Sequence, residues 1–395
     1  MSGRDLFCPP RRFRRGAALT LVFAGVLVTG AATGSFPEPD AAAPAASARR
    51  AAPAPKGAAT GHEDVQRAAA QAMADGTSPM EAAERAVSRS GDRWGAVYSE
   101  DEYQEFQDAL DGRYTGVGLW ARRERDGRIE VTRVQPGSPA AEAGIRAGDR
   151  LRSVDGRKVD GRPVTEVVSL LRGDADDAAA GTTVTLGLER GTRAWTETLR
   201  RARLSTDSVT VRRLPDGVTI IRIAAFTKGS GDTVRSAVRQ APADAGIVLD
   251  LRGNSGGLVT EAVKTASAFL DGGLVATYDV DGVQRALHAD SGGDTTRPLV
   301  TLVDGGTMSA AEMLTGALQD RGRAVVVGSR TFGKGSIQMP TGLPDGSVAE
   351  LTVGHYRTPL GHAVDGRGIT PDLEAAPDEA ERRAETVLAG LGDPS

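Results

Sequence analysis

Cysteine is nearly absent from this chain of 395 residues, because Cys8 is the only one. A single cysteine excludes a disulfide within the chain, and its place before the first apolar run argues against zinc-cysteine sites and thiol chemistry. The net charge of −4 shows no basic excess, which makes nucleic acid an unexpected partner. Histidine is also scarce, and none of the four has a recognisable catalytic setting: His62, His288, His355 and His362. A serine nucleophile in this chain would therefore need another kind of base.

The N-terminus is typical of a targeting segment. Four arginines precede an uncharged apolar run from Ala17 to Ala32, which resembles the apolar part of an export signal. We predict that residues 1–34 are a signal peptide or membrane anchor and that residues 35–61, rich in Pro and Ala, are a flexible linker. The bulk of the chain is then exported, either secreted or anchored at the cell envelope.

The remaining sequence divides into three segments by its periodicity. Residues 62–113 hold three runs with helix-start and helix-stop signals and predict a small N-terminal helical module. Residues 114–204 alternate as strands around two short helices. Residues 205–395 repeat apolar strands and helices in β-α-β order, which predicts an α/β core, and the tail from Gly346 indicates added strands and loops.

The order of elements in residues 114–204 resembles a PDZ domain, with "TGVGL" as its opening loop and "GIRAGDRLRSVDG" in its middle. Such a domain binds an extended peptide by adding it to a sheet edge while loop N–H groups hold the terminal carboxylate. The candidate loop residues are Gly116, Val117, Gly118 and Leu119. The alternative is that these glycines only make a turn.

The segment "VDGGTMSAAE", residues 303–312, places Ser309 between a glycine-rich turn and the first turn of a helix. Ser309 and Glu312 fit a capping box, which alone would explain both residues. A catalytic serine needs a base in addition, and a lysine can serve if burial keeps its amine neutral.

Lys334 lies in "GSRTFGKGSIQ", residues 328–338, directly after the strand "AVVVG". This segment nearly matches a phosphate-binding loop, but Gly335 stands where the Mg²⁺-binding Ser or Thr belongs and no helix pattern follows. Glycines on both sides indicate that the lysine backbone is held close to another segment. Because β-α-β connections allow Ser309 and Lys334 to meet at one sheet edge, a Ser-Lys pair is the stronger hypothesis, with Gln338 fixing the lysine rotamer.

Acyl transfer also requires N–H donors for the oxyanion. The N–H of Ala310 follows the candidate nucleophile at a helix start, where N–H groups lack helical partners. The turn "RGNSGG", residues 252–257, offers a second donor from Gly256 or Gly257, unless it is an ordinary glycine-rich turn between strand and helix.

Several blocks in order are similar to those of the carboxyl-terminal processing peptidases, also called tail-specific proteases. The blocks are "GDRWGAVYSEDEYQEFQDALDGRYTGVGL", the PDZ segment, "DLRGNSGG", "GTMSAAEMLTGALQDRGRAVVVGSRTFGKGSIQ" and "GRGITPD". The resemblance runs from about Asp64 to about Leu373 and implies a ClpP/crotonase-like core. The sequence departs from the family pattern at Met308, where alanine is usual, and at Ser255, where proline is usual.

The resemblance implies metal-free peptide hydrolysis without a cofactor, with protein or peptide C-terminal tails as the substrate. It assigns Ser309 as the nucleophile, Lys334 as the general base and Gln338 as the residue that orients the base. It also matches Arg172 to an arginine proposed to sense bound substrate in the PDZ domain. An inactive PDZ-containing binding or scaffold protein stays the alternative, and the sequence leaves homodimer formation and the natural substrate open.

Overall fold

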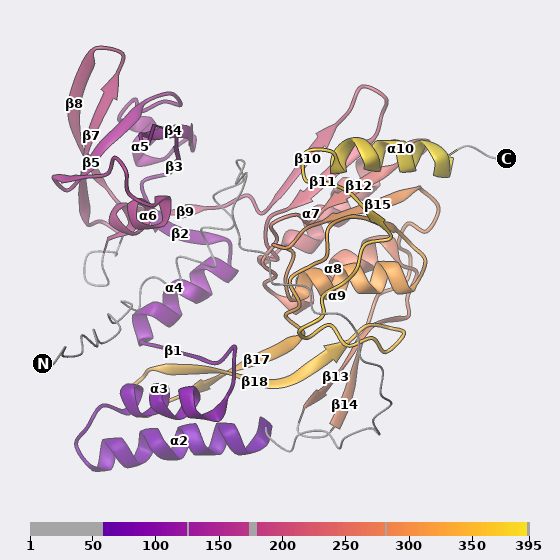
Figure 1. The fold of residues 1–395 in the computed structure, drawn as a ribbon, viewed down its shortest axis with the longest axis horizontal. Helices are drawn as coiled ribbons and strands as arrows, with labels where there is room; N and C mark the ends of the chain where they lie inside the picture. The colour runs from indigo at the N-terminus through magenta and orange to yellow at the C-terminus, as the bar shows by residue number, and fades with distance from the viewer. Residues whose placement is uncertain (1–57, 125, 174–179, 281–282, 393–395) are drawn as a thin grey trace, which may run out of the picture. The chain divides into compact units, whose positions relative to one another are not determined.

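The structure, a computed structural model, describes residues 58–124, 126–173, 180–280 and 283–392. The predicted signal segment and most of the predicted linker lie outside these residues. The described chain forms two compact units, which are coloured along the sequence in Figure 1. One unit is Arg113–Thr206, and the other combines the described residues before 113 with those from 207 onward. None of the described helices has the length and apolar character that crossing a bilayer requires.

The unit Arg113–Thr206 is built around an antiparallel sheet with the strand order β3-β4-β5-β7-β8, in which β6 pairs with β5. Its strands are β3 (Leu119–Arg123), β4 (Ile129–Val134), β5 (Arg150–Val154), β6 (Arg157–Lys158), β7 (Thr183–Arg190) and β8 (Arg193–Arg200). A separate pair joins β2 (Arg113–Gly116) to β9 (Ala202–Ser205). The helices are α5 (Pro139–Glu142) and α6 (Val164–Arg172).

Period-two alternation explains why this sheet buries one face. Val184, Leu186 and Leu188 of β7 are at most 1% exposed, and they share a cluster with Val167 and Leu171 of α6. The apolar stripe of α6 therefore covers the buried face of the sheet.

The second unit contains a sheet with the strand order β10-β11-β12-β15-β16-β19, parallel except for the β10–β11 pair. Its strands are β10 (Val209–Arg213), β11 (Thr219–Ile223), β12 (Ile247–Asp250), β15 (Leu299–Val303), β16 (Val325–Gly328) and β19 (Leu373–Glu374). The helices around it are α7 (Ser230–Gln240), α8 (Val259–Phe269), α9 (Ala310–Asp320) and α10 (Ala380–Gly392). Strands buried on both faces explain the apolar runs of the sequence.

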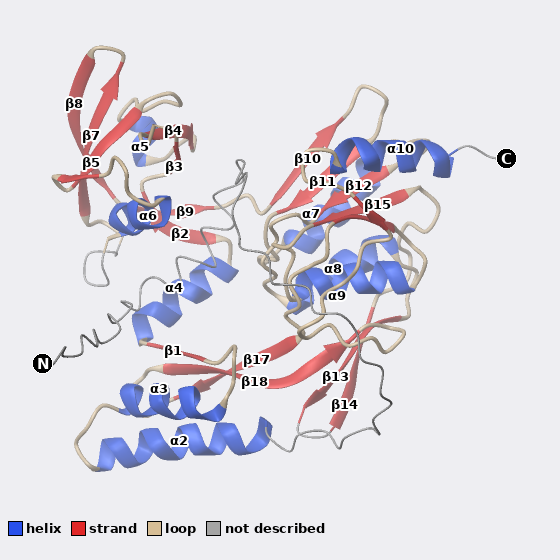
Figure 2. Ribbon diagram, viewed as in Figure 1, coloured by secondary structure: helices blue, strands red, loops and turns tan. Residues whose placement is uncertain are grey.

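Helices cover both faces of this parallel sheet, as Figure 2 shows. On one face, Ile221 and Leu249 share a cluster with residues of α7, α8 and α9. On the other face, Val248 and Val300 pack against α10. The sequence analysis predicts only strands and loops after Gly346, so the helix α10 differs from that prediction. Its buried stripe consists of Ala380, Ala384 and Leu388, which do lie at helical spacing.

A further sheet of this unit has the order β1-β18-β13-β14, with β17 also paired to β18. Its strands are β1 (Ala96–Tyr98), β13 (Leu274–Val280), β14 (Val283–His288), β17 (Ser336–Gly342) and β18 (Val348–Arg357). The segment "LVATYDV" is thus a strand, as predicted, but it pairs with β14 and β18 instead of joining the parallel sheet.

The three helices expected before residue 113 are present as α2 (Ala58–Ala74), α3 (Pro79–Ser90) and α4 (Glu100–Leu110). Val65 and Ala69 of α2 share a cluster with Ala83 of α3 and with Leu351 of β18. The helices α2 and α3 therefore pack against the β17–β18 hairpin within the second unit.

Candidate active site

Three loops at the carboxyl ends of β12, β15 and β16 carry the candidate residues. The strand ends are level because Asp250 pairs with Leu302 and Val303 pairs with Gly328. In open sheets of this kind, ligands bind in the crevice outside the carboxyl ends of the parallel strands. The loops also touch one another directly, since the Met308 N–H donates to the Asn254 carbonyl at 2.8 Å.

Ser309 occupies a sharp turn between β15 and α9. Its φ of 53° and ψ of −118° are those of the first central position of a type II′ turn. The turn is closed by the Ala311 N–H, which donates to the Met308 carbonyl at 3.0 Å. Among the described residues, Asp155 is the other non-glycine residue with positive φ. Strained conformations of this kind cluster at active sites. They recur where a nucleophilic residue occupies a sharp turn between a strand and a helix.

Glu312 does more than cap α9. Its side chain is completely buried, and Oε2 accepts hydrogen bonds from the Ser309 N–H at 2.9 Å and from the Lys334 N–H at 2.8 Å. Oε1 accepts from the Thr331 hydroxyl at 2.5 Å and from the Gly333 N–H at 2.7 Å. Burial raises the pKa of Glu312, while these four donors act in the opposite direction. One carboxylate therefore joins the main chains of the two candidate dyad residues.

Tyr356 of β18 makes a second bridge between the same two residues. Its hydroxyl donates to the Ser309 carbonyl at 2.9 Å and lies 3.3 Å from the Lys334 carbonyl. The ring is 2% exposed, and burial raises the pKa of its phenol well above the ordinary value. The hydroxyl thus stays protonated and able to donate.

The backbone around Lys334 is held against the loop that follows β18. A Cβ at Gly335 would lie 2.5 Å from the Asp365 N atom, and one at Gly333 would lie 3.1 Å from the Arg367 N atom. The expectation that the flanking glycines mark a close backbone approach is confirmed. The strand β17 follows this loop, so the nucleotide-binding alternative lacks the helix N-terminus that would cradle a phosphate.

Lys334 and Gln338 are brought together. Lys334 Nζ donates to Gln338 Oε1 at 2.9 Å. The β17–β18 register shifts between Ile337 and Gln338, which pairs Gln338 with Thr352. Such an irregularity re-aims the side chains that follow it. The geometry therefore directs Gln338 toward the lysine amine.

Burial lowers the pKa of Lys334 below its ordinary value, although Glu350 and Asp92 favour the charged form. Its Nζ makes no hydrogen bond to Ser309 Oγ, so the structure joins the two residues through their main chains and not through their side chains. Proton transfer between them requires a further approach, and such contacts often tighten only when substrate binds.

The two candidate sources of the second oxyanion donor differ in their hydrogen bonding. The Gly256 N–H donates to Asn254 Oδ1 at 2.8 Å. Neither the Gly257 N–H nor the Ala310 N–H has a hydrogen-bond acceptor within the described chain. The glycine turn lies against the candidate nucleophile, because a Cβ at Gly256 would be 3.0 Å from Ser309 Cβ.

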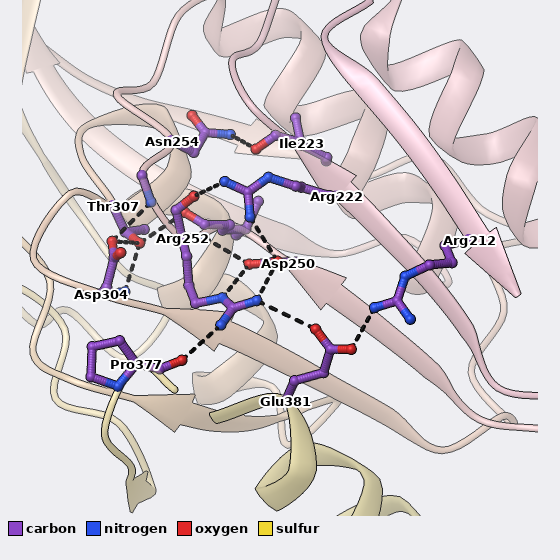
Figure 3. Close-up of polar contacts among 12 residues, drawn as sticks. Arg212, Arg222, Ile223, Asp250, Arg252, Asn254, Asp304, Thr307, Pro377 and Glu381 are labelled. Carbon is purple, nitrogen blue, oxygen red and sulfur yellow. Dashed lines mark hydrogen bonds and ion pairs between the residues drawn. The ribbon is translucent and has the colours of Figure 1, made fainter. Parts of the chain in front are cut away.

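Figure 3 shows how the base of this turn is anchored. Arg252 donates to the buried Asp250 carboxylate at 2.8 and 2.7 Å and to the Pro377 carbonyl at 3.2 Å. These hydrogen bonds to Asp250 raise the pKa of Arg252. At the next loop, Asp304 Oδ1 accepts from the Gly253 N–H at 2.9 Å. The network ties both loops to the sheet and to the segment that precedes α10.

In the other unit, the candidate peptide-binding loop connects β2 to β3. The Val117 and Gly118 carbonyls accept hydrogen bonds from Ala140 and Gln135, whereas their N–H groups have no acceptor in the described chain. The strand β3 lies at an edge of its sheet. Arg172 is the last residue of α6 and lies close to Tyr114. Burial raises the pKa of Tyr114 to about 12, although the Arg172 guanidinium offsets part of this effect.

Sequence reasoning missed three contributors to this site. Glu312 is visible in the sequence only as half of a capping box, and the structure adds its contacts with the Lys334 loop. No local signal marks Tyr356 as a bridge. Trp94 lies in one of the blocks that resemble the family, and its carbonyl accepts a hydrogen bond from Gln338 Nε2.

Two family models and several known proteins match parts of this chain. A family model described as peptidase family S41 matches residues 217–375, and a PDZ domain model matches residues 130–180. Carboxyl-terminal-processing peptidase 3, chloroplastic, from Arabidopsis thaliana is 36% identical over 308 residues, which cover 73% of this chain and 58% of that protein. A probable CtpA-like serine protease from Staphylococcus haemolyticus is 34% identical over 292 residues, which cover 72% of this chain and 57% of that protein.

The chain thus spans less than two thirds of the length of these two relatives. Among solved structures, the photosystem II D1 C-terminal processing protease is 30% identical, with a TM-score of 0.50 over 80% of this chain and 86% of that one. The chain therefore belongs to peptidase family S41, together with the carboxyl-terminal processing peptidases, and it contains a PDZ domain.

Proposed function

We propose that this chain is an exported serine endopeptidase that recognises protein C-terminal tails through its PDZ domain and hydrolyses peptide bonds with a Ser-Lys dyad. The observation that carries the proposal is the pair of bridges between Ser309 and Lys334. A helix cap needs only the contact between Glu312 and the Ser309 N–H. Both Glu312 and Tyr356 also contact the Lys334 main chain. A dyad needs such contacts, because its two side chains must be held in one geometry.

The chemistry begins with a neutral Lys334 amine, which burial favours and which Gln338 orients. The amine takes the proton from Ser309 Oγ as the oxygen attacks the peptide carbonyl. Negative charge then develops on the carbonyl oxygen, and we assign its stabilisation to the N–H groups of Ala310 and Gly257. Gly256 stays the less suitable donor while its N–H is bonded to Asn254.

The tetrahedral intermediate collapses when the C–N bond breaks and the Lys334 ammonium gives its proton to the leaving amine. The acyl group is then an ester of Ser309. The same amine next takes a proton from water as the water oxygen attacks the ester carbonyl. When the bond between the carbonyl carbon and Ser309 Oγ breaks, the Lys334 ammonium returns its proton to Ser309 Oγ, which releases the peptide acid and regenerates both the serine and the neutral lysine. The scheme balances without a metal or a redox partner.

Tail recognition follows from the edge of β3 and the loop before it. An incoming peptide would pair with β3, and its terminal carboxylate would accept hydrogen bonds from the N–H groups around Val117 and Gly118. Gly116 and Leu119 complete this loop as the flanking residues of β2 and β3. Arg172, whose guanidinium acts on the pKa of Tyr114 at the base of the same loop, is our candidate sensor of an occupied domain.

The finer domain organisation is part of the proposal. We divide the chain into a helical module at 62–113, a PDZ domain at 114–204 and a peptidase core at 205–395 with ClpP/crotonase-like layers. The parallel sheet with helices on both faces supports this layering. Residues 1–34 would direct export and either be removed or tether the protein to a membrane, and the N-terminal helices are a candidate surface for homodimer formation.

The proposal is tested by degradation of a test protein that carries a C-terminal tail, with the full chain as the enzyme. Ser309→Ala and Lys334→Ala should each reduce kcat at least about 1,000-fold, as losses of dyad members do in serine proteases. Lys228→Ala, at a side chain that is 75% exposed, is the matched lysine control and should retain activity. Cleavage that survives both dyad substitutions would reject the mechanism.

The alternative of an inactive scaffold predicts a different pattern in the same experiment. The wild-type chain would bind the tail peptide and leave the test protein intact at every pH. Stimulation of cleavage by nucleotide and Mg²⁺ would instead restore the phosphate-loop interpretation of Gly328 to Gln338.

A further inference from the structure

The loop of residues 92–95, "DRWG", lies between α3 and β1, outside the segment that matches the peptidase family model. We propose that this DRWG loop is a positioning device for the base: Trp94 fixes the orientation of Gln338 and covers the Lys334 amine, and Asp92 anchors the loop to the strand beside Gln338. The inference rests on the proposed Ser-Lys mechanism and adds residues to it.

The orientation of the Gln338 amide decides which of its two ends faces Lys334. A carboxamide has a donor end and an acceptor end, and only the acceptor end can receive a hydrogen bond from the lysine. The Trp94 carbonyl accepts a hydrogen bond from Gln338 Nε2, while Gln338 Oε1 accepts from Lys334 Nζ at 2.9 Å. Because a carbonyl accepts and never donates, it selects the orientation in which the oxygen faces the lysine.

The indole ring of Trp94 lies beside the Lys334 amine. Its centroid lies 5.1 Å from Lys334 Nζ, and the Phe332 ring packs beside it at 5.8 Å. The ring replaces water next to the amine and so contributes to the burial that lowers the pKa of Lys334. Its π face also attracts the ammonium that forms when the lysine takes a proton. Trp94 therefore suits both protonation states through which a general base passes.

The Asp92 side chain anchors the DRWG loop to β18. The Asp92 carboxylate accepts from the Trp94 and Gly95 N–H groups at 3.0 Å each. It also accepts from the Thr352 N–H and hydroxyl at 2.8 Å each. Thr352 is the register partner of Gln338 on β18, so the loop is fixed to the same strand pair that carries the lysine's hydrogen-bond partner.

Two carboxylates face the Lys334 amine. Partial burial by itself raises the pKa of Asp92, but the hydrogen bonds from Thr352, Trp94 and Gly95 hold it below its ordinary value. Asp92 therefore keeps its negative charge. Glu350 of β18 is the other carboxylate, and burial raises its pKa. Both charges oppose the loss of a proton from Lys334, whereas burial, to which the Trp94 ring contributes, favours the neutral amine.

The test compares Trp94→Ala, Trp94→Phe and Asp92→Asn in the full chain, with pH profiles of kcat and KM for a tailed peptide. Trp94→Ala should lower kcat about 100-fold with little change in KM, which is the cost of a misplaced catalytic group. It should also move the acid limb of the kcat profile to higher pH, because water reaches the amine. Trp94→Phe keeps an aromatic face and should restore most of both properties.

Asp345→Asn is the matched control for Asp92→Asn. Asp345 also anchors a turn of the β17–β18 hairpin, by accepting from the Ser347 N–H at 3.2 Å and from the Met80 N–H at 3.1 Å. It should lose some stability and keep the wild-type pH profile, whereas Asp92→Asn should shift it. If Asp92→Asn fails to fold, Thr352→Val removes one of the four hydrogen bonds but keeps the Asp92 charge, so it should move the acid limb to higher pH, by less than Trp94→Ala does.

Wild-type pH profiles for Trp94→Ala and Asp92→Asn, with Ser309→Ala inactive, would overturn the inference and leave the peptidase assignment intact. Failure of the wild-type chain to cleave any tailed substrate would count against the proposed function. In that case, the pH dependence of Lys334 acetylation by acetic anhydride, followed by mass spectrometry, still tests the loop. Trp94→Ala should then shift the labelling midpoint upward, and an unchanged midpoint would overturn the inference.

Discussion

Replacement of Ser309, the proposed nucleophile, by glycine should stabilise the fold relative to replacement by alanine, although neither variant keeps the hydroxyl that the proposed acyl-enzyme requires. Ser309 adopts φ 53° and ψ −118°, a region that glycine enters freely and that residues with a Cβ enter at a cost. Alanine keeps the Cβ and therefore keeps the strain. Glycine has no Cβ and therefore relieves the strain.

The magnitude follows from two opposing effects. A non-glycine residue in a sparsely populated backbone region costs about 1–3 kcal/mol. Glycine gives back about 0.4–1 kcal/mol because it increases the entropy of the unfolded chain. The net advantage of glycine over alanine at position 309 is therefore about 1 kcal/mol.

The assay is equilibrium unfolding in urea, with the two variants compared at matched slope. Ser99 supplies the control, because it also precedes a helix in a capping box but has φ −62° and ψ 166°. The glycine–alanine difference at Ser99 measures the ordinary preference of a helix cap. The glycine–alanine difference at Ser309 should exceed the one at Ser99 by about 1 kcal/mol, because only Ser309 of the two has a strained backbone. Equal differences at the two serines would refute the claim that the nucleophile turn is strained.

Three further predictions concern other parts of the site. Glu312→Gln places an amide nitrogen against main-chain N–H donors and should destabilise the chain by about 3 kcal/mol in urea, whereas Glu102→Gln, in the second capping box, should cost under about 1 kcal/mol because glutamine also serves there. Equal losses would contradict the bridging role. Glu350→Gln removes a charge that raises the pKa of the lysine base, so the acid limb of kcat/KM should move to lower pH; movement to higher pH would reverse the assigned sign. Gly118→Ala would place a Cβ 2.2 Å from a serine side chain, and the resulting strain should weaken tail-peptide binding at least about 10-fold in fluorescence anisotropy. Gly137→Ala, also at positive φ but in open space, should bind almost as the wild type does, and similar losses in both variants would argue against a role for the loop.

Much of the fold follows from the local pattern of the sequence. The runs "IVLD" and "LVTLV" become strands buried on both faces, because all of their side chains except Asp250 and Thr301 are apolar. Helix-start residues correctly locate α3 and α4, since the hydroxyls of Ser78 and Ser99 accept helical N–H groups. The close approach at Gly333 and Gly335 is equally readable, because glycine is the residue that leaves room for another backbone.

Tertiary structure alone decided which of these elements meet. The pairing of β13 with β18, the position of α10 and the contact between Trp94 and Gln338 all join residues far apart in the chain. Local periodicity encodes which face of an element is buried, but it carries no information about the partner that covers that face. The sequence by itself determined most of the strands and helices, although not α10, and the residue types that suit a Ser-Lys pair. The long-range hydrogen bonds of Glu312 and Tyr356 bring the main chains of that pair together, because only the folded chain places one carboxylate and one phenol between both loops.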